Sequence, residues 1–244
     1  MTGQVVDTES AREFMREALQ KITEAELSAI ADECLVKHER VGSLLARPSG
    51  VPPTEPELRA LLRSIFSTRR RAAELLDRVG AERLAGWIGD LVAPRGAVEA
   101  RFQVFCDRLE GFPPSVSYDL AGELLHFTDP DRYWLWTRWV WDPKTRTGAL
   151  PLVTMEEYDL DAPSVGAMYL RVGEAIAFVH ETGRAAGFTL IGGETFGVDV
   201  YLACVYCVYI YTTVRMRMTQ EFNRVIPPLP ELCRRFLGVY RMEI

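Results

Sequence analysis

The chain has 244 residues, of which 48% are hydrophobic and 25% charged, and its formal net charge is −6. This length and composition are typical of a soluble globular protein with a sizeable core, built as one large domain or two small ones. The negative charge argues against a dedicated nucleic-acid binder, because such proteins carry a basic excess. The stretch from Arg59 to Arg83 is a local exception, with seven arginines against three carboxylates.

The first predicted element is an amphipathic helical region. From about Ser10 to Leu45, apolar residues recur every three to five positions, which predicts helix. The prolines and glycine of residues 47–56, RPSGVPPTEP, then predict a loop or an interdomain linker. We therefore divide the chain into an N-terminal helical segment, 1–47, and a main helical domain, 54–244, with one continuous domain as the alternative.

Capping signals mark the helices that follow. Thr54 is a suitable N-cap, and Glu57 stands at the capping-box position three residues later. Helical periodicity continues over 72–91 and over 97–109. After the stop GFPPS, Ser117 is the predicted cap of a helix with the sequence YDLAGELLHF.

The tryptophans are concentrated in residues 126–143, HFTDPDRYWLWTRWVWDP. Four of the chain's five tryptophans lie there: Trp134, Trp136, Trp139 and Trp141. Asp129 is a good N-cap and Pro130 fits the first helical position, so we predict a helix of about three turns. The alternating tryptophans would also suit a strand.

This tryptophan-rich segment admits three interpretations. A helix that is apolar on every side is normally buried, so our first interpretation is hydrophobic core. Aromatic and arginine enrichment is typical of protein interfaces, which makes a partner surface the second. A ligand pocket, with Arg138 stacked on a ring, is the third.

The rest of the chain is predicted to be mostly helical. Residues 144–163 have the turn residues and the short apolar run of a loop with at most one strand, and helical periodicity returns over 164–186. The sequence FTLIGGETFG, 188–197, is typical of a strand that runs into a glycine loop. An apolar helix over 198–223 and a short helix over 231–237 follow. The predicted fold class is mostly α: an irregular helical domain with a buried Tyr-rich C-terminal helix and at most one small β element.

Targeting signals are weak in this sequence. The longest uncharged run, from Val200 to Val214, has 15 residues, whereas a membrane span needs roughly 20. We interpret it as a buried core helix. The polar N-terminus has no apolar signal core. The five cysteines lie mostly among apolar residues, which favours a reducing cytoplasm over a disulfide framework.

Three motifs contain residue types that can bind a metal, a cofactor or an anion. Glu123 and His126 form a Glu-x-x-His pair like those of di-iron bundles, but the second pair that such sites need is missing. Cys204 and Cys207 form the lone CxxC, without a second pair for zinc, and we interpret them as core residues. The glycines of GGETFG, 192–197, predict a tight turn. We expect neither a metal nor a cofactor.

One stretch resembles a known family. LEGFPPSVSYDLAGELLHFTDPDRYWLW, about 30 of the 244 residues, is similar to the hairpin-plus-helix segment of helix-hairpin-helix DNA-glycosylase-like proteins. Pro114 and Ser115 replace the hairpin glycines of that family, and Thr137 or a tryptophan stands where the family has its catalytic aspartate. Because these departures remove both the phosphate-binding hairpin and the acid, the resemblance does not imply the family's activity.

Three classes of function are compatible with these observations, and the third is less favoured than the first two. The first is a non-catalytic accessory or protein-interaction factor, with a protein partner or self-association. The second is an enzyme or small-molecule binder, in which His126 is the general acid/base, Arg138 the anion contact and Asp199 an orienting acid. The third is a nucleic-acid-associated protein that uses the 59–83 region. The candidate pocket or interface residues are Glu123, His126, Trp134, Trp136, Arg138, Trp139, Trp141, Glu194 and Asp199.

Overall fold

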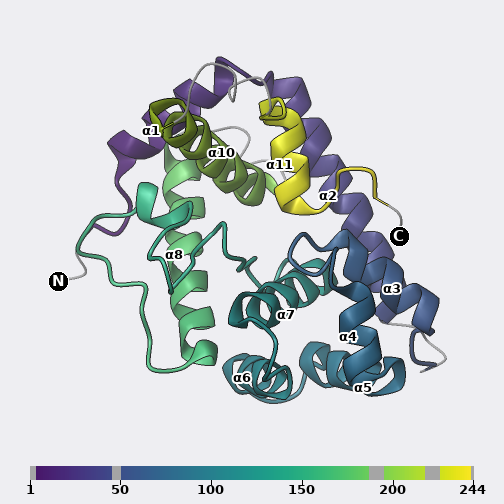
Figure 1. The fold of residues 1–244 in the computed structure, drawn as a ribbon. Helices are drawn as coiled ribbons and strands as arrows, with labels where there is room; N and C mark the ends of the chain where they lie inside the picture. The colour runs from purple at the N-terminus through teal and green to yellow at the C-terminus, as the bar shows by residue number, and fades with distance from the viewer. Residues whose placement is uncertain (1–3, 46–50, 187–194, 218–225, 243–244) are drawn as a thin grey trace. The chain divides into compact units, whose positions relative to one another are not determined.

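The computed structural model describes residues 4–45, 51–186, 195–217 and 226–242 (Figure 1). Within these ranges the chain forms α-helices, one short 3-10 helix at Leu150–Leu152 and no β-strand, so the mostly α prediction is confirmed. The α-helices are α1 (Thr8–Leu19), α2 (Glu24–Leu45), α3 (Glu55–Ser64), α4 (Ala72–Val79), α5 (Ala81–Val92), α6 (Val98–Arg108), α7 (Pro114–Thr128), α8 (Val165–Ala185), α10 (Gly197–Arg217) and α11 (Leu229–Leu237).

The helices fall into two compact units. The first unit comprises Met1–Cys34, Trp139–Asp159 and Ala175–Tyr240, and the second comprises Leu35–Arg138, Leu160–Glu174 and Arg241–Ile244. Helices α2 and α8 each contribute residues to both units. The sequence-based division into 1–47 and 54–244 stays a prediction.

The first unit is built on α10, which packs against α1 and α11. Helix α10 is apolar on all sides, and its residues from Val198 to Val205 are buried, as predicted for a core helix. The Tyr201 hydroxyl donates a hydrogen bond to the backbone oxygen of Ala11 in α1 at 3.0 Å. No helix in the described part of the chain combines the length and the apolar character that crossing a membrane requires.

The N-terminus of the first unit lies along the loop before α8. Asp7 caps α1 by accepting hydrogen bonds from the backbone N–H groups of Glu9 and Ser10. Its own N–H donates to the Val153 oxygen at 3.0 Å. The sequence allowed one strand over 144–163. The described residues there form only isolated bridges, each of which joins a single pair of residues, and no β-strand.

The second unit contains α3 to α7. Helices α5, α6 and α7 pack on one another, and α3 packs on α4 and α5. The predicted capping box is confirmed, since the Glu57 carboxylate accepts hydrogen bonds from the N–H and the hydroxyl of Thr54. The helical region 72–91 is divided at Gly80, whose φ of 87° is a conformation that favours glycine.

Two predicted helix starts were wrong. Helix α7 begins at Pro114, not after Ser117, whose hydroxyl donates instead to the Pro114 oxygen at 2.8 Å. Asp129 does not start a helix but ends α7, and its N–H donates to the Leu125 oxygen at 3.1 Å. An Asp-Pro pair is compatible with the start of a helix and also with its end, because proline is common both at the first helical position and just beyond the last one.

The predicted tryptophan-rich helix does not exist. After a turn at 130–132, residues 133–137 form neither helix nor strand, and a further turn follows at 138–140. The N–H groups of Arg132 and Tyr133 both donate to the Asp129 oxygen, whereas the Arg138 N–H donates to the Asp119 carboxylate of α7 at 2.7 Å. A tertiary contact has therefore overridden the local helix signals.

Candidate functional site

A row of polar side chains runs along one face of α7, the most buried helix of the second unit. Asp119, Glu123 and His126 are spaced i, i+4 and i+7, so they project from the same side. Each of these side chains is buried, and so is every other residue from Val116 to Phe127. Buried polar groups are costly unless they are paired, so their partners decide what the row can do.

Glu123 forms a buried ion pair with Lys37 of α2. The exposed fractions are 1% for Lys37 and 2% for Glu123. The Lys37 ammonium also lies 4.0 Å from the centre of the Phe127 ring. Next to it, His38 Nδ1 donates to the Phe127 backbone oxygen at 2.9 Å. Two adjacent residues of α2 therefore hold the last turns of α7.

Asp119 is paired with Arg138 by two hydrogen bonds. Its second carboxylate oxygen accepts from the Arg138 Nε at 3.2 Å, in addition to the backbone bond. Burial raises the pKa of Asp119 to about 7, with Arg138 opposing the rise and the Glu123 carboxylate adding to it. A carboxyl group that titrates near neutrality is a feature of acid–base sites and also of structural networks.

His126 lies in the last turn of α7 and is fixed by the segment that follows it. Its Nδ1 donates to the Tyr133 backbone oxygen at 2.7 Å, so Nδ1 carries the proton. The Tyr133 hydroxyl in turn accepts from an Arg101 nitrogen at 3.0 Å. The His126 ring is therefore held at the end of α7 by the backbone of the segment that follows.

Two of the predicted site tryptophans, Trp134 and Trp136, lie in the second unit, and Trp136 packs in its core. Trp136 is 1% exposed, and its ring stacks on Tyr118, with centroids 4.8 Å apart. Its backbone oxygen lies so close to Gly122 of α7 that a Cβ there would come within 2.0 Å of it. Trp134 is half-buried, and its backbone oxygen accepts from the Tyr169 hydroxyl at 3.2 Å. Gly122 thus lets the Trp136 backbone lie directly on α7.

The remaining predicted site residues are not part of this cluster. Trp139, Trp141 and Asp199 are buried and belong to the first unit, so neither unit by itself contains the whole predicted set. The Trp139 ring lies 6.1 Å from that of Phe236. Glu194 lies outside the described residues.

Sequence reasoning missed Lys37 and Asp119. Lys37 is one of only three lysines, and Asp119 precedes Glu123 by one helical turn in an otherwise apolar helix. The rarity of lysine and the one-turn spacing of Asp119 and Glu123 are both visible in the sequence. The spatial partner of Asp119, however, depends on the non-helical path of the tryptophan-rich segment, which no local pattern indicates.

The CxxC motif is buried, as predicted, but it has a third partner. Cys233 of α11 places its sulfur 3.6 Å from that of Cys204 and 3.5 Å from that of Cys207. The hydrogen bond to Cys233, together with burial, raises the pKa of Cys204, and burial raises that of Cys207. Among the described residues, no group of three His, Cys, Asp or Glu side chains is arranged to hold a metal ion.

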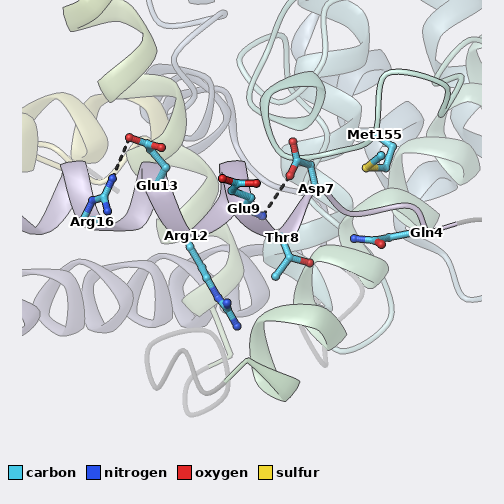
Figure 2. Close-up of a pocket in the computed structure, with 8 residues that line it drawn as sticks. All are labelled: Gln4, Asp7, Thr8, Glu9, Arg12, Glu13, Arg16 and Met155. Atoms are coloured by element: carbon cyan, nitrogen blue, oxygen red, sulfur yellow. Dashed lines mark hydrogen bonds and ion pairs between the residues drawn. The ribbon is translucent and has the colours of Figure 1, made fainter.

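A polar cleft of about 820 Å³ lies beside the start of α1 in the first unit (Figure 2). Asp7, which lines it, is engaged in capping α1, and Arg16 pairs with Glu13 at 2.9 Å. In Figure 2 the Arg12 side chain points to the other side of α1 from Glu13. The cleft therefore combines a helix cap with a surface ion pair, and it does not bring charges of one sign together.

A smaller apolar groove of about 240 Å³ lies between α5 and α6 in the second unit. Trp87, half-buried, and Val104, 46% exposed, contribute its apolar surface. Arg108 lies at its edge, 5.9 Å from the Trp87 ring, and pairs with Asp90 at 2.6 Å. We call this feature the α5–α6 groove; its lining residues are Trp87, Asp90, Leu91, Ala100, Arg101, Val104, Phe105 and Arg108.

Neither the cleft nor the groove is lined by Asp119, Glu123 or His126. No protein-family model, curated protein sequence or solved structure matches this chain.

Proposed function

We propose that the chain is a non-catalytic accessory protein of the cytoplasm, and that it binds another protein through the α5–α6 groove. The observation that carries the proposal is the composition of this groove. It combines the half-buried indole of Trp87, the exposed Val104 and two arginines. Tryptophan and arginine are the residues that most often dominate binding energy at protein interfaces.

The buried polar row of α7 supports a non-catalytic role. Glu123 is neutralised by Lys37, Asp119 by Arg138, and His126 donates its Nδ1 proton to a backbone oxygen. A catalytic group needs a substrate within hydrogen-bond reach, and these groups instead bond to the protein. The five buried free cysteines are the support for a reducing cytoplasm.

The proposal is tested by photo-crosslinking in the native host. A photoreactive amino acid is placed at Val104 in the groove and, as a matched control, at Val36 of α2. Val36 is also an exposed valine of the second unit, at 39% against 46%, but it does not line the groove. We expect a defined polypeptide adduct at position 104 that is absent at position 36. A second copy of the chain in that adduct would identify self-association as the interaction.

A companion variant makes the result specific. Trp87→Ala should abolish the adduct at position 104, because it removes the aromatic ring that lines the groove. Val36→Asp should leave it unchanged. The same adducts at both positions, or none at position 104 under conditions where the protein is abundant, would rule out the groove as the interaction surface.

A second candidate function rests on the last turn of α3 and the turn that leads to α4. Arg63, Arg69 and Arg70 are exposed there, and no carboxylate pairs with them among the described residues. Such a basic surface could attract a nucleic acid through its phosphates. Fluorescence anisotropy with a labelled duplex at several salt concentrations tests this. Binding that weakens steeply with salt, and that is lost in a triple Arg→Gln variant, is expected; no binding at low salt would contradict it.

A further inference from the structure

Three cysteines that are far apart in the sequence meet inside the first unit. The sulfur of Cys233 lies 3.6 Å from that of Cys204 and 3.5 Å from that of Cys207. The exposed fractions of all three side chains are 2% or less. Cys204 and Cys207 are three residues apart on α10, so they share one face of that helix, and α11 packs against it.

These distances between the sulfur atoms are short enough for a disulfide to form. A disulfide has an S–S distance of about 2.05 Å, so each contact would have to close by roughly 1.5 Å. Because the side chains already touch, rotation about their own bonds supplies much of that approach, and the two helices need to shift little. Cys233 has two alternative partners at almost equal distance, which makes it the common member of either pair.

We propose that Cys233 is an oxidation site, at which a small peroxide joins α11 to α10 through a disulfide with Cys204 or Cys207. In the first step one thiolate attacks the peroxide O–O bond, which gives a sulfenic acid and, with hydrogen peroxide, releases water. In the second step a neighbouring thiol attacks the sulfenic sulfur, forms the S–S bond and releases the sulfenic oxygen as water. Two thiols and one hydrogen peroxide therefore give one disulfide and two waters.

The surroundings of the three cysteines define the oxidant and the rate. Burial keeps bulky disulfides such as oxidised glutathione away from the sulfurs, so a small neutral oxidant is required. Burial also raises the pKa of Cys207, so the reactive thiolate is scarce at neutral pH. We expect the reaction to be slow near neutrality and to accelerate roughly tenfold per pH unit while the pH stays below the thiol pKa values.

The test uses the folded, full-length chain with a small excess of hydrogen peroxide at about pH 8.5. After quenching, the protein is alkylated in denaturant and digested without reduction for mass spectrometry. We expect two of the five thiols to be lost, with the peptide containing Cys233 linked to the peptide containing Cys204 and Cys207. A parallel reaction with oxidised glutathione should leave all five thiols free.

Matched variants identify the partners. Cys204→Ser and Cys207→Ser should each still lose two thiols, because Cys233 keeps its other partner, whereas Cys233→Ser should lose none. Cys106→Ser, which removes a buried thiol of the second unit, should behave like the unaltered chain. Five free thiols after oxidation of the unaltered chain, a disulfide that omits Cys233, or sulfinic acid without a disulfide would each overturn the proposal. The peptide map of the unaltered chain decides even if a variant fails to fold.

Discussion

Lys37 and Glu123 are 86 residues apart in sequence and form an ion pair inside the second unit, with Lys37 also placed over the Phe127 ring. Removing one member of such a pair leaves a buried charge without its partner. This relationship ties the middle of α2 to α7 and makes the pair a sensitive point of the fold.

Replacing Lys37 by Met should lower the free energy of unfolding by about 3–5 kcal/mol, because Glu123 is then left buried and unneutralised. Urea denaturation of the purified variant measures this loss. Arg16→Met breaks an exposed ion pair with Glu13 and should cost less than about 1 kcal/mol. Adding Glu123→Met to Lys37→Met should recover part of the stability; a further loss equal to the first would contradict the pairing.

Asp119 should make stability fall as the pH rises from about 4 to 7. Its pKa is about 7 in the folded chain and 3.8 ordinarily, so over this range the folded state holds a proton that the unfolded state has released. Stability therefore decreases with pH, by at most about 1.4 kcal/mol per pH unit. Urea midpoints of the unaltered chain and of Asp119→Asn, compared at several pH values, measure the effect.

The Asp119→Asn variant should lack this component of the pH dependence. The difference between the two stability curves should be largest across pH 4 to 7 and should level off above about pH 7. Identical slopes in the two proteins would mean that Asp119 is ionised throughout and that Arg138 outweighs burial.

Gly122→Ala should destabilise the chain, because a Cβ at this position would lie 2.0 Å from the Trp136 backbone oxygen. Overpacking of this kind typically costs about 1–3 kcal/mol. Gly86→Ala on α5 is the matched control, since a Cβ there meets nothing within 4 Å. That change should stabilise the helix by up to about 1 kcal/mol. Equal effects of the two changes on the melting temperature would show that the Trp136 backbone does not lie on α7.

Trp136→Ala should lower stability by about 3–5 kcal/mol, since its ring is buried between Tyr118 and Phe102. Trp87→Ala removes a half-exposed ring and should cost clearly less. Thermal and urea unfolding of both variants make the comparison. A Trp136→Ala protein of unchanged stability would contradict its role in the core.

Local signals were sufficient where a helix carries its own caps and periodicity. Thr54 with Glu57 predicted the start of α3 correctly, and the apolar run after Val198 predicted the buried α10. The tryptophan-rich segment failed because Asp129 and Pro130 look like a helix start in isolation. The contacts that decide its path, from Arg138 to Asp119 and from Trp136 to Gly122, join residues 14 to 19 positions apart.

The candidate site was predicted in part for a similar reason. The Glu123–His126 pair is visible from its helical spacing, and both residues lie in the polar row of α7. Lys37 and Cys233 supply the decisive partners, and each is separated from its contact by 26 residues or more. A single sequence has no pattern that specifies such pairings.

The tryptophan-rich segment passes from the second unit to the first between Arg138 and Trp139. Trp87, Trp134 and Trp136 therefore emit from one unit, and Trp139 and Trp141 from the other. Replacing the tryptophans of one unit by phenylalanine would leave tryptophan fluorescence from the other unit alone. The eight residues 134–141 therefore place tryptophans in both units. Fluorescence of the two phenylalanine variants during denaturation would show whether the units unfold one after the other or together.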